Sequence, residues 1–226
     1  MIERAGDGYP GAVRDYVEGY LAEDDVILDA RARGDGMGCV AVGPGGGAGL
    51  RFLAASISAR AVVEVGTGAG VSGLWLLGGM AADGVLTSID VDPEAQRVAR
   101  TAFTAAGHAP SRLRLINGMG LEVLPRLTDG GYDLVFVDAA PSTAGGTRID
   151  AVADYPRYLD EAVRLLRPGG IVALAGVLAG GVADPDAVDA GSVALREVAR
   201  QVREDERLVG VLLPLGDGLL AAVTMH

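Results

Sequence analysis

Short, mostly apolar runs of five or six residues recur along this chain, and several are rich in β-branched side chains. Segments with helical composition separate the first five runs, which cover residues 61–65, 85–89, 112–116, 132–137 and 171–175. The run 61–65 is apolar and β-branched apart from Glu64, which is typical of a strand buried on both faces of a parallel sheet. Two last runs flank a Pro-Leu-Gly-Asp-Gly turn, at 208–213 and 219–223. The pattern predicts an α/β protein with a doubly wound, mostly parallel seven-stranded sheet and an antiparallel C-terminal hairpin.

The segments between these runs predict helices. Residues 71–80 are largely apolar, residues 159–166 have one apolar face and end at Arg-Pro-Gly-Gly, and residues 193–206 are charged. Residues 1–45 predict an accessory helical segment. Its apolar side chains at helical spacing would cover a crevice or a partner subunit; they are Val13, Tyr16, Val17, Tyr20 and Leu21. Nothing marks a second domain, so residues 1–226 predict a single one.

The first run leads into a glycine-rich loop. Glu64 is followed by Gly66, Gly68 and Gly70, and glycine lets a backbone turn sharply and approach a ligand. Because a helix is predicted directly after it, the loop suits a nucleotide-like ligand. The dinucleotide fingerprint needs its third glycine where Val71 stands, whereas Glu64 fits the E-x-G-x-G-x-G loop of S-adenosylmethionine-dependent methyltransferases. A simple turn is the alternative, because 35 of the 226 residues are glycine.

An acidic residue ends the second run. Asp90 lies 22 residues after Gly68, where a second parallel strand places a carboxylate beside a ribose. Both dinucleotide and S-adenosylmethionine sites use such a carboxylate. Asp90 therefore supports nucleoside binding but does not distinguish between these two kinds of site. The alternative is that Asp90 only caps the following helix.

Several motifs together resemble a known family. In order and spacing they look like the catechol and caffeoyl-coenzyme A class of S-adenosylmethionine-dependent O-methyltransferases, most closely those of actinobacteria. The resemblance covers residues 40–226 and rests on Glu64 to Gly70, Ser72, Asp90, Phe136 to Ala139, Leu166 to Gly170 and Leu213 to Gly218. It implies the Rossmann-like methyltransferase fold, S-adenosylmethionine as cofactor and a homodimer.

The resemblance also implies roles for single positions. The contacts with the amino-acid end and the sulfonium match Glu64, Gly66, Thr67, Gly68 and Ser72. Asp90 matches the acid that binds the ribose hydroxyls, and the positions around the adenine match Val91, Gly118 and Met119. Val42 matches one more cofactor contact, although a flexible linker is the alternative for the glycine-rich segment beside it.

The metal site of the family is incomplete in this chain. Metal-dependent members carry Asp-Ala-Asp-Lys after the fourth strand and Asp-Asn after the fifth. Here the first motif reads Asp138-Ala139-Ala140-Pro141, and the second reads Ala175-Gly176. Mg²⁺ prefers oxygen ligands and usually keeps one or two carboxylates, so we expect no metal unless later carboxylates replace the missing ligands.

Deprotonation of an acceptor then depends on few residues. The chain has no lysine and two histidines, and neither His108 nor His226 is expected at the crevice. Asp138 is the best candidate for the catalytic base, or else a carboxylate that only orients the sulfonium. The candidates for its partners are Asp154, Tyr155 and Tyr158. The segment 139–154 looks like an insertion, either a substrate lid over the crevice or a surface loop.

Composition limits the partners. The net charge is −11 and basic clusters are absent, so a nucleic-acid substrate is disfavoured. The start lacks the apolar core of a signal peptide, and the apolar stretch 171–182 is too short to span a membrane. Cys39 is the single cysteine and forms no intrachain disulfide. These observations favour a cytoplasmic protein that acts on small molecules.

Three hypotheses follow. The first is an O-methyltransferase that methylates an oxygen of a small-molecule acceptor without a metal. The second is a relative that binds S-adenosylmethionine but serves as a regulatory or scaffold protein, as the incomplete metal site suggests. The third is an NAD-dependent oxidoreductase, which the glycine loop and Asp90 also permit.

Overall fold

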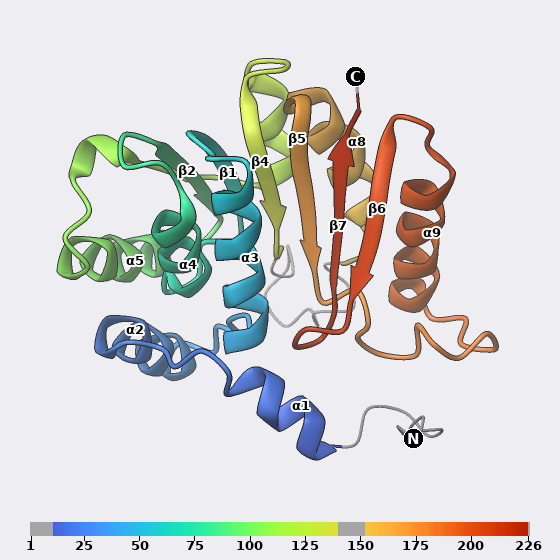
Figure 1. Cartoon of the computed structure of the whole chain (residues 1–226), viewed down its shortest axis with the longest axis horizontal. Helices are drawn as coiled ribbons and strands as arrows, with labels where there is room; N and C mark the ends of the chain where they lie inside the picture. Colours follow the sequence, from blue (N-terminus) through green and yellow to red (C-terminus); the bar gives the residue numbers. More distant parts are fainter. Residues whose placement is uncertain (1–10, 140–151, 226) are drawn as a thin grey trace, which may run out of the picture.

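The central element is a seven-stranded sheet in the order β3-β2-β1-β4-β5-β7-β6 (Figure 1). The computed structural model describes residues 11–139 and 152–225. The first five strands are parallel, and β7 is antiparallel to both β5 and β6. The strands are β1 Ala61–Val65, β2 Val85–Asp90, β3 Leu113–Asn117, β4 Tyr132–Val137, β5 Leu166–Ala175, β6 Leu208–Leu213 and β7 Leu219–Thr224. The predicted mostly parallel sheet with an antiparallel C-terminal hairpin is confirmed.

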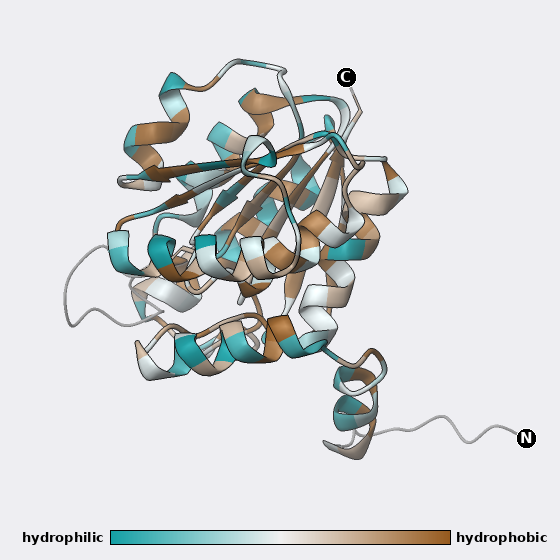
Figure 2. Ribbon diagram, turned by 90° about the vertical axis from the view of Figure 1, so that its left-hand side faces the viewer, coloured by the Kyte–Doolittle hydropathy of each residue, from teal (hydrophilic) through white to brown (hydrophobic). Residues whose placement is uncertain are grey.

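Helices cover both faces of the sheet. They are α1 Gly11–Glu18, α2 Asp25–Gly36, α3 Pro44–Ser56, α4 Val71–Gly79, α5 Pro93–Ala105, α6 Gly120–Val123, α8 Tyr155–Leu165 and α9 Ala190–Glu204, with short 3₁₀ turns η1 Pro110–Arg112 and η2 Leu124–Arg126. One core cluster joins α2, α3, α4 and α5 to Leu134 and Phe136 of β4. The other joins α8 and α9 to Val135 and Val137, because successive strand residues point to opposite faces. Figure 2 shows the apolar strands enclosed between these layers.

Local signals explain where several helices begin. Asp24, Asp92 and Asp189 precede α2, α5 and α9, and each accepts a hydrogen bond from a backbone amide in the first turn. Such capping satisfies donors that have no partner inside the helix. Helix α9 therefore begins before the predicted 193–206 range.

The glycine-rich segment beside Val42 is a helix and not a flexible linker. Pro44 stands in the first turn of α3, and Gly45, Gly46 and Gly47 are buried. A Cβ atom on Gly47 would lie 2.3 Å from the Trp75 ring, so only glycine lets α3 approach α4 this closely. The run of glycines therefore serves a contact between two helices.

The boundary between α8 and β5 differs from the expectation. The helix begins four residues earlier than the predicted 159–166, since Tyr155 and Tyr158 are buried on the sheet and belong to its apolar face. Leu166 already pairs with Tyr132 of β4, with a register shift before Leu134, so the Arg-Pro-Gly-Gly segment lies within β5. The Arg-Pro-Gly-Gly segment, which the sequence predicted to end the helix, is therefore part of the strand, because the pairing of β5 with β4 is irregular at this point.

Helices α1 and α2 lie beyond the edge of the sheet at which the parallel strands end (Figure 1). Ligands of open α/β sheets bind at this edge. Most of the predicted lid lies outside the described residues, which include only Ala139 and 152–154 of it. Within the described part of the chain, no helix combines the length and the apolar character needed to cross a bilayer.

Candidate functional site

The glycine loop after β1 adopts a conformation that depends on its glycines. Gly66 has φ +96°, and a Cβ atom there would lie 2.0 Å from the carbonyl oxygen of Asp138. Gly68 and Gly70 also have positive φ angles, of +49° and +96°. The loop thus brings the end of β1 against the end of β4 and turns directly into α4, and its backbone is bare of side chains where a ligand would approach.

Asp90 holds this loop from the neighbouring strand. Its Oδ2 accepts a hydrogen bond from the Gly68 amide at 2.9 Å, and its Oδ1 accepts one from the Asp92 amide at 2.9 Å. The cap of α5 is Asp92, whose carboxylate accepts from the Glu94 amide at 2.8 Å. Asp90 is therefore not the helix cap, and its carboxylate is fixed at the rim of the loop.

Glu64 is completely buried beneath the loop. Ser72 Oγ donates to its Oε1 at 2.5 Å, and Ser88 Oγ donates to its Oε2 at 2.5 Å. Burial raises the pKa of Glu64 to about 7; the two serine hydrogen bonds oppose this shift, and the charges of Asp138 and Asp90 add to it. A buried carboxyl faced by two other acids is poised to accept a positively charged partner.

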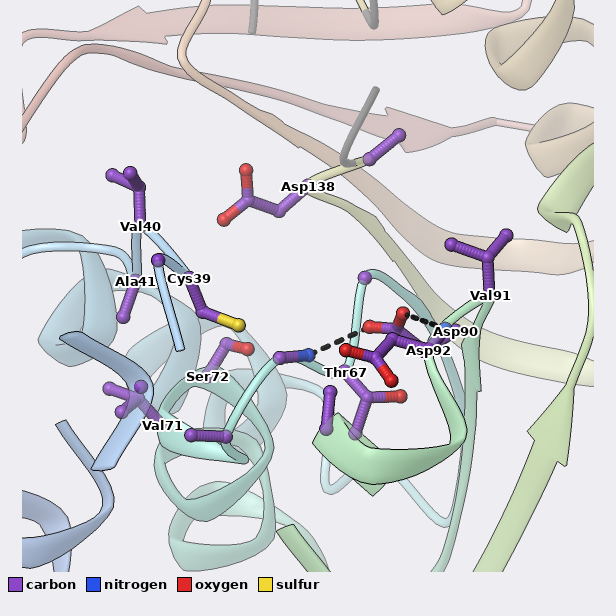
Figure 3. Close-up of a pocket in the computed structure, with 17 residues that line it drawn as sticks. Cys39, Val40, Ala41, Thr67, Val71, Ser72, Asp90, Val91, Asp92 and Asp138 are labelled. Carbon is purple, nitrogen blue, oxygen red and sulfur yellow. Dashed lines mark hydrogen bonds between the residues drawn. The ribbon is translucent and has the colours of Figure 1, made fainter. Parts of the chain in front are cut away.

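A cavity of about 370 Å³ opens beside the loop (Figure 3). Asp138 points into it from the end of β4, opposite the segment that carries Cys39 and Val40. Of the predicted residues, the lining includes Gly66, Thr67, Gly68, Ser72, Asp90, Val91 and Asp138. We call this space the main cavity.

The wall formed by Cys39, Val40 and Ala41 was not predicted, nor was Asp92. These wall residues follow α2, and nothing in their own sequence pattern marks them; the fold alone brings them over the loop. Burial raises the pKa of the Cys39 thiol, and the negative charges of Asp90 and Asp92 add to this shift. Cys39 is therefore a neutral, weakly polar part of the wall.

A second cavity, of about 270 Å³, shares Ala41 with the main cavity. It is lined by Val42, which does not line the main cavity, by Ala175 and Gly176 at the end of β5, and by the Leu215 to Leu219 turn. Glu18 of α1 closes it, because its carboxylate accepts hydrogen bonds from the Gly45 and Gly216 amides, both at 2.8 Å. The accessory segment is thus part of the wall of this second cavity.

A third, small cavity of about 30 Å³ lies between Val91 and Gly118, where the adenine was expected. Tyr158 lines it as well, and burial raises the pKa of its hydroxyl group. Met119 does not line any of these three cavities and is 41% exposed.

Two of the expected partners of Asp138 have further contacts of their own. The Tyr155 hydroxyl donates to the carbonyl oxygen of Ala175 at 2.8 Å and is buried. Asp154 forms an exposed ion pair with Arg157. His108 contacts Arg112, which binds carbonyl groups at the opposite end of β2, so it lies away from the site as expected. Within residues 11–139 and 152–225, no three His, Cys, Asp or Glu side chains cluster as metal ligands would.

Comparison with known proteins assigns this site to a family. A family model described as O-methyltransferase matches residues 29–225. A Mycolicibacterium vanbaalenii protein named as an O-methyltransferase is 54% identical, over 93% of this chain and 89% of the relative. A solved structure from Corynebacterium glutamicum has a TM-score of 0.84 and 31% identity, over 96% of this chain and 97% of the other.

A second solved structure contains a cofactor. The O-methyltransferase of Streptomyces achromogenes that is involved in tomaymycin synthesis was solved in complex with S-adenosylmethionine. It has a TM-score of 0.80 and 28% identity, over 95% of this chain and 96% of the other. The resemblance expected from the sequence motifs is therefore confirmed, and this chain belongs to the O-methyltransferase family.

Proposed function

We propose that this protein transfers a methyl group from S-adenosylmethionine to an oxygen of a small-molecule acceptor, without a bound divalent metal. The observation that carries the proposal is the arrangement around the main cavity. The loop of Gly66 to Gly70 lies between the buried acid Glu64 and the fixed acid Asp90, and Asp138 faces the same space.

The residues present fit this cofactor. Glu64 is a buried acid whose charged neighbours are acids too, which suits the ammonium group of the cofactor's amino-acid end. Asp90 keeps acceptor capacity for ribose hydroxyls beyond its two amide bonds. The cavity between Val91 and Gly118 suits the edge of a base. The relative from Streptomyces achromogenes, solved with S-adenosylmethionine, supports the same assignment.

The remaining assignments follow the same scheme. The amino-acid end would also contact the loop backbone at Gly66, Thr67 and Gly68 and the Ser72 hydroxyl. The contacts of Met119 with the base and of Val42 with the cofactor rest on the family resemblance alone, because neither residue lines the main cavity or the third cavity. When bound, the cofactor supplies an electrophilic methyl group on its sulfonium. Positioning an acceptor atom near that group and excluding water are the main tasks left to the protein.

The second cavity is the proposed acceptor site. Strands β4 and β5 pair in register, Val137 with Leu174, so Asp138 and Ala175 follow at neighbouring strand ends. An acceptor in the second cavity would therefore meet Asp138 at the border between the two cavities. A phenol has a pKa of about 10, like tyrosine, and must lose its proton; the Asp138 carboxylate would take that proton as a general base.

The residues opposite Asp138 support chemistry without a metal. Ala175 and Gly176 offer no side-chain oxygen at the end of β5, and the Ala175 carbonyl oxygen already accepts a hydrogen bond from Tyr155. Among the residues that the structure describes, a hard cation such as Mg²⁺ would find one carboxylate there instead of the oxygen-rich set it prefers. Acidic oxygens, such as those of carboxylic acids or enols, would need the least help from a metal.

Two measurements test the proposal. Calorimetry should show that S-adenosylhomocysteine binds and that NAD does not; NAD binding alone would favour an oxidoreductase. A methyl-transfer screen over catechols, phenols and carboxylic acids should then find turnover that EDTA leaves unchanged and Mg²⁺ does not raise. Loss of all turnover on chelation would overturn the metal-free part, and cofactor binding with no turnover on any acceptor would favour a regulatory protein.

A further inference from the structure

Ser88 lies beneath the glycine loop, although no motif of the chain points to it. It is fully buried on β2 and stands opposite Glu64 in the pairing of β1 with β2. Its hydroxyl is 2.5 Å from Glu64 Oε2 and 2.7 Å from Thr67 Oγ1. One side chain outside the main cavity thus contacts both the buried acid and a residue of the loop.

The direction of these hydrogen bonds follows from the number of protons. A serine hydroxyl has one proton, and donation to an ionised Glu64 uses it. Thr67 must then donate to Ser88, so the bonds run from Thr67 through Ser88 to Glu64. Ser72 donates to the other carboxylate oxygen. Both oxygens of Glu64 are therefore held, and the Thr67 side chain is oriented by the same hydroxyl.

Among residues 11–139 and 152–225, no positively charged side chain contributes to the pKa shift of Glu64. The groups that face its carboxyl are the hydroxyls of Ser72 from α4 and Ser88 from β2, and the carboxyls of Asp90 and Asp138 at the ends of β2 and β4. Short hydroxyl-to-carboxylate bonds of about 2.5–2.7 Å are strong, charge-assisted ones. Ser88 consequently provides half of the hydrogen bonds that stabilise an ionised Glu64.

We propose that Ser88 is a positioning residue for the amino-acid end of the cofactor, acting through Glu64 and Thr67. The inference rests on the proposed function, because it needs that end of the cofactor to lie at these two residues. Without the Ser88 hydroxyl, one buried oxygen of Glu64 and the Thr67 hydroxyl both lose a partner. The carboxyl would then meet the ligand's ammonium group in the wrong orientation or in its neutral form.

A pair of ligands tests this role by equilibrium binding. S-adenosylhomocysteine carries the amino-acid end, whereas 5′-methylthioadenosine has the same nucleoside and sulfur but lacks it. In the Ser88→Ala variant, we expect Kd for S-adenosylhomocysteine to rise about 10-fold to 30-fold, a range typical for a bond to a charged group. Kd for 5′-methylthioadenosine should stay within about twofold.

Two further variants make the result specific. Thr87→Ala changes the adjacent buried residue, whose side chain points to the other face of the sheet, and should leave the ratio of the two Kd values unchanged. Thr67→Val breaks the same chain of hydrogen bonds while keeping the side-chain shape, and should reproduce the selective loss even where Ser88→Ala folds poorly.

The outcomes separate the two proposals. An equal loss for both ligands in Ser88→Ala and Thr67→Val, or no loss for either, would overturn the positioning role while leaving the proposed function intact. Failure of the unmodified protein to bind either ligand would overturn the proposed function and this inference together. A loss confined to S-adenosylhomocysteine supports the role of Ser88.

Discussion

Asp90 and Gly68 are joined by a hydrogen bond of 2.9 Å from the Gly68 amide to the Asp90 carboxylate. This contact crosses from the end of β2 to the loop after β1, so one side chain both shapes the loop and faces the main cavity. Because the other carboxylate oxygen is held by the Asp92 amide, the side chain cannot turn away without breaking two bonds.

The first prediction concerns this contact. Asp90→Asn keeps the shape but removes the negative charge, and the bonds to a charged acceptor are worth about 1.5–3 kcal/mol each. We expect Kd for S-adenosylhomocysteine to rise at least about 10-fold by calorimetry. Asp189→Asn, which changes the cap of the distant helix α9, serves as the control and should leave Kd unchanged. Equal affinities of the Asp90 variant and the unmodified protein would contradict the role of Asp90.

A second prediction concerns loop geometry. Gly66→Ala places a Cβ atom 2.0 Å from the Asp138 carbonyl oxygen at a φ of +96°, so the ends of β1 and β4 must separate. We expect a loss of more than about 2 kcal/mol in the free energy of unfolding, measured by denaturant titration. Gly107→Ala is the matched control: it has φ +79° but open space around the new Cβ atom, and should cost about 1 kcal/mol. Similar losses in both variants would show that the close approach is unimportant.

The pKa of Glu64 predicts how stability depends on pH. In the folded protein this pKa is raised from 4.5 to about 7, so the folded state holds the proton more tightly than the unfolded chain does. The free energy of unfolding should therefore fall as pH rises from 4.5 to 7 and level off above, by at most about 3.5 kcal/mol. Denaturant titrations of the ligand-free protein against Glu64→Gln measure this difference. A constant difference between the two proteins across this range would contradict the prediction.

The same group should govern cofactor affinity. The ligand's ammonium group favours the ionised form of Glu64, so binding of S-adenosylhomocysteine releases a proton below pH 7 and tightens as pH rises through 7. Calorimetry in buffers with different heats of ionisation counts the released protons. Glu64→Gln should bind more weakly and with no such release; proton release that persists in this variant would have to come from another group.

A last prediction separates chemistry from binding. Asp138→Asn removes the proposed base and should lower kcat about 100-fold or more with a phenolic acceptor, since general base catalysis contributes roughly 10²–10⁴. Kd for S-adenosylhomocysteine should change far less. For an acceptor that is already ionised, such as a carboxylate, the loss of kcat should be small. A large loss for both acceptor types would favour the alternative in which Asp138 orients the sulfonium.

The sequence allowed the sheet, the loop and the line of acids at strand ends to be predicted, because these depend on local periodicity and on fixed distances along the chain. Glu64 stands one residue before the end of β1, Asp90 ends β2 and Asp138 follows β4. These strands are neighbours, and parallel strands bring such ends together. The family motifs lie in the same segments, so the resemblance and the residue pattern agreed.

Other parts depend on tertiary contacts that no local pattern reveals. Cys39 to Ala41 form a wall only because the connection from α2 to α3 crosses the loop. In the sequence, Gly47 is one of several glycines in a low-complexity segment. Only the structure shows that it packs against Trp75. Ser88 looks like one more residue of a buried strand, and its role emerges only from its register with Glu64.

The second cavity, unlike the main one, is lined by residues from near the start and near the end of the sequence, and Glu18 is one of them. The described residues that line the main cavity lie between positions 34 and 139, whereas Glu18 meets Gly216, 198 residues further along the chain. During synthesis, the ribosome therefore supplies these residues long before the turn between β6 and β7 is made. The second cavity closes only when α1 meets the turn between β6 and β7, so a protein cut short before residue 215 would retain the described residues of the main cavity and lose a wall of the second one.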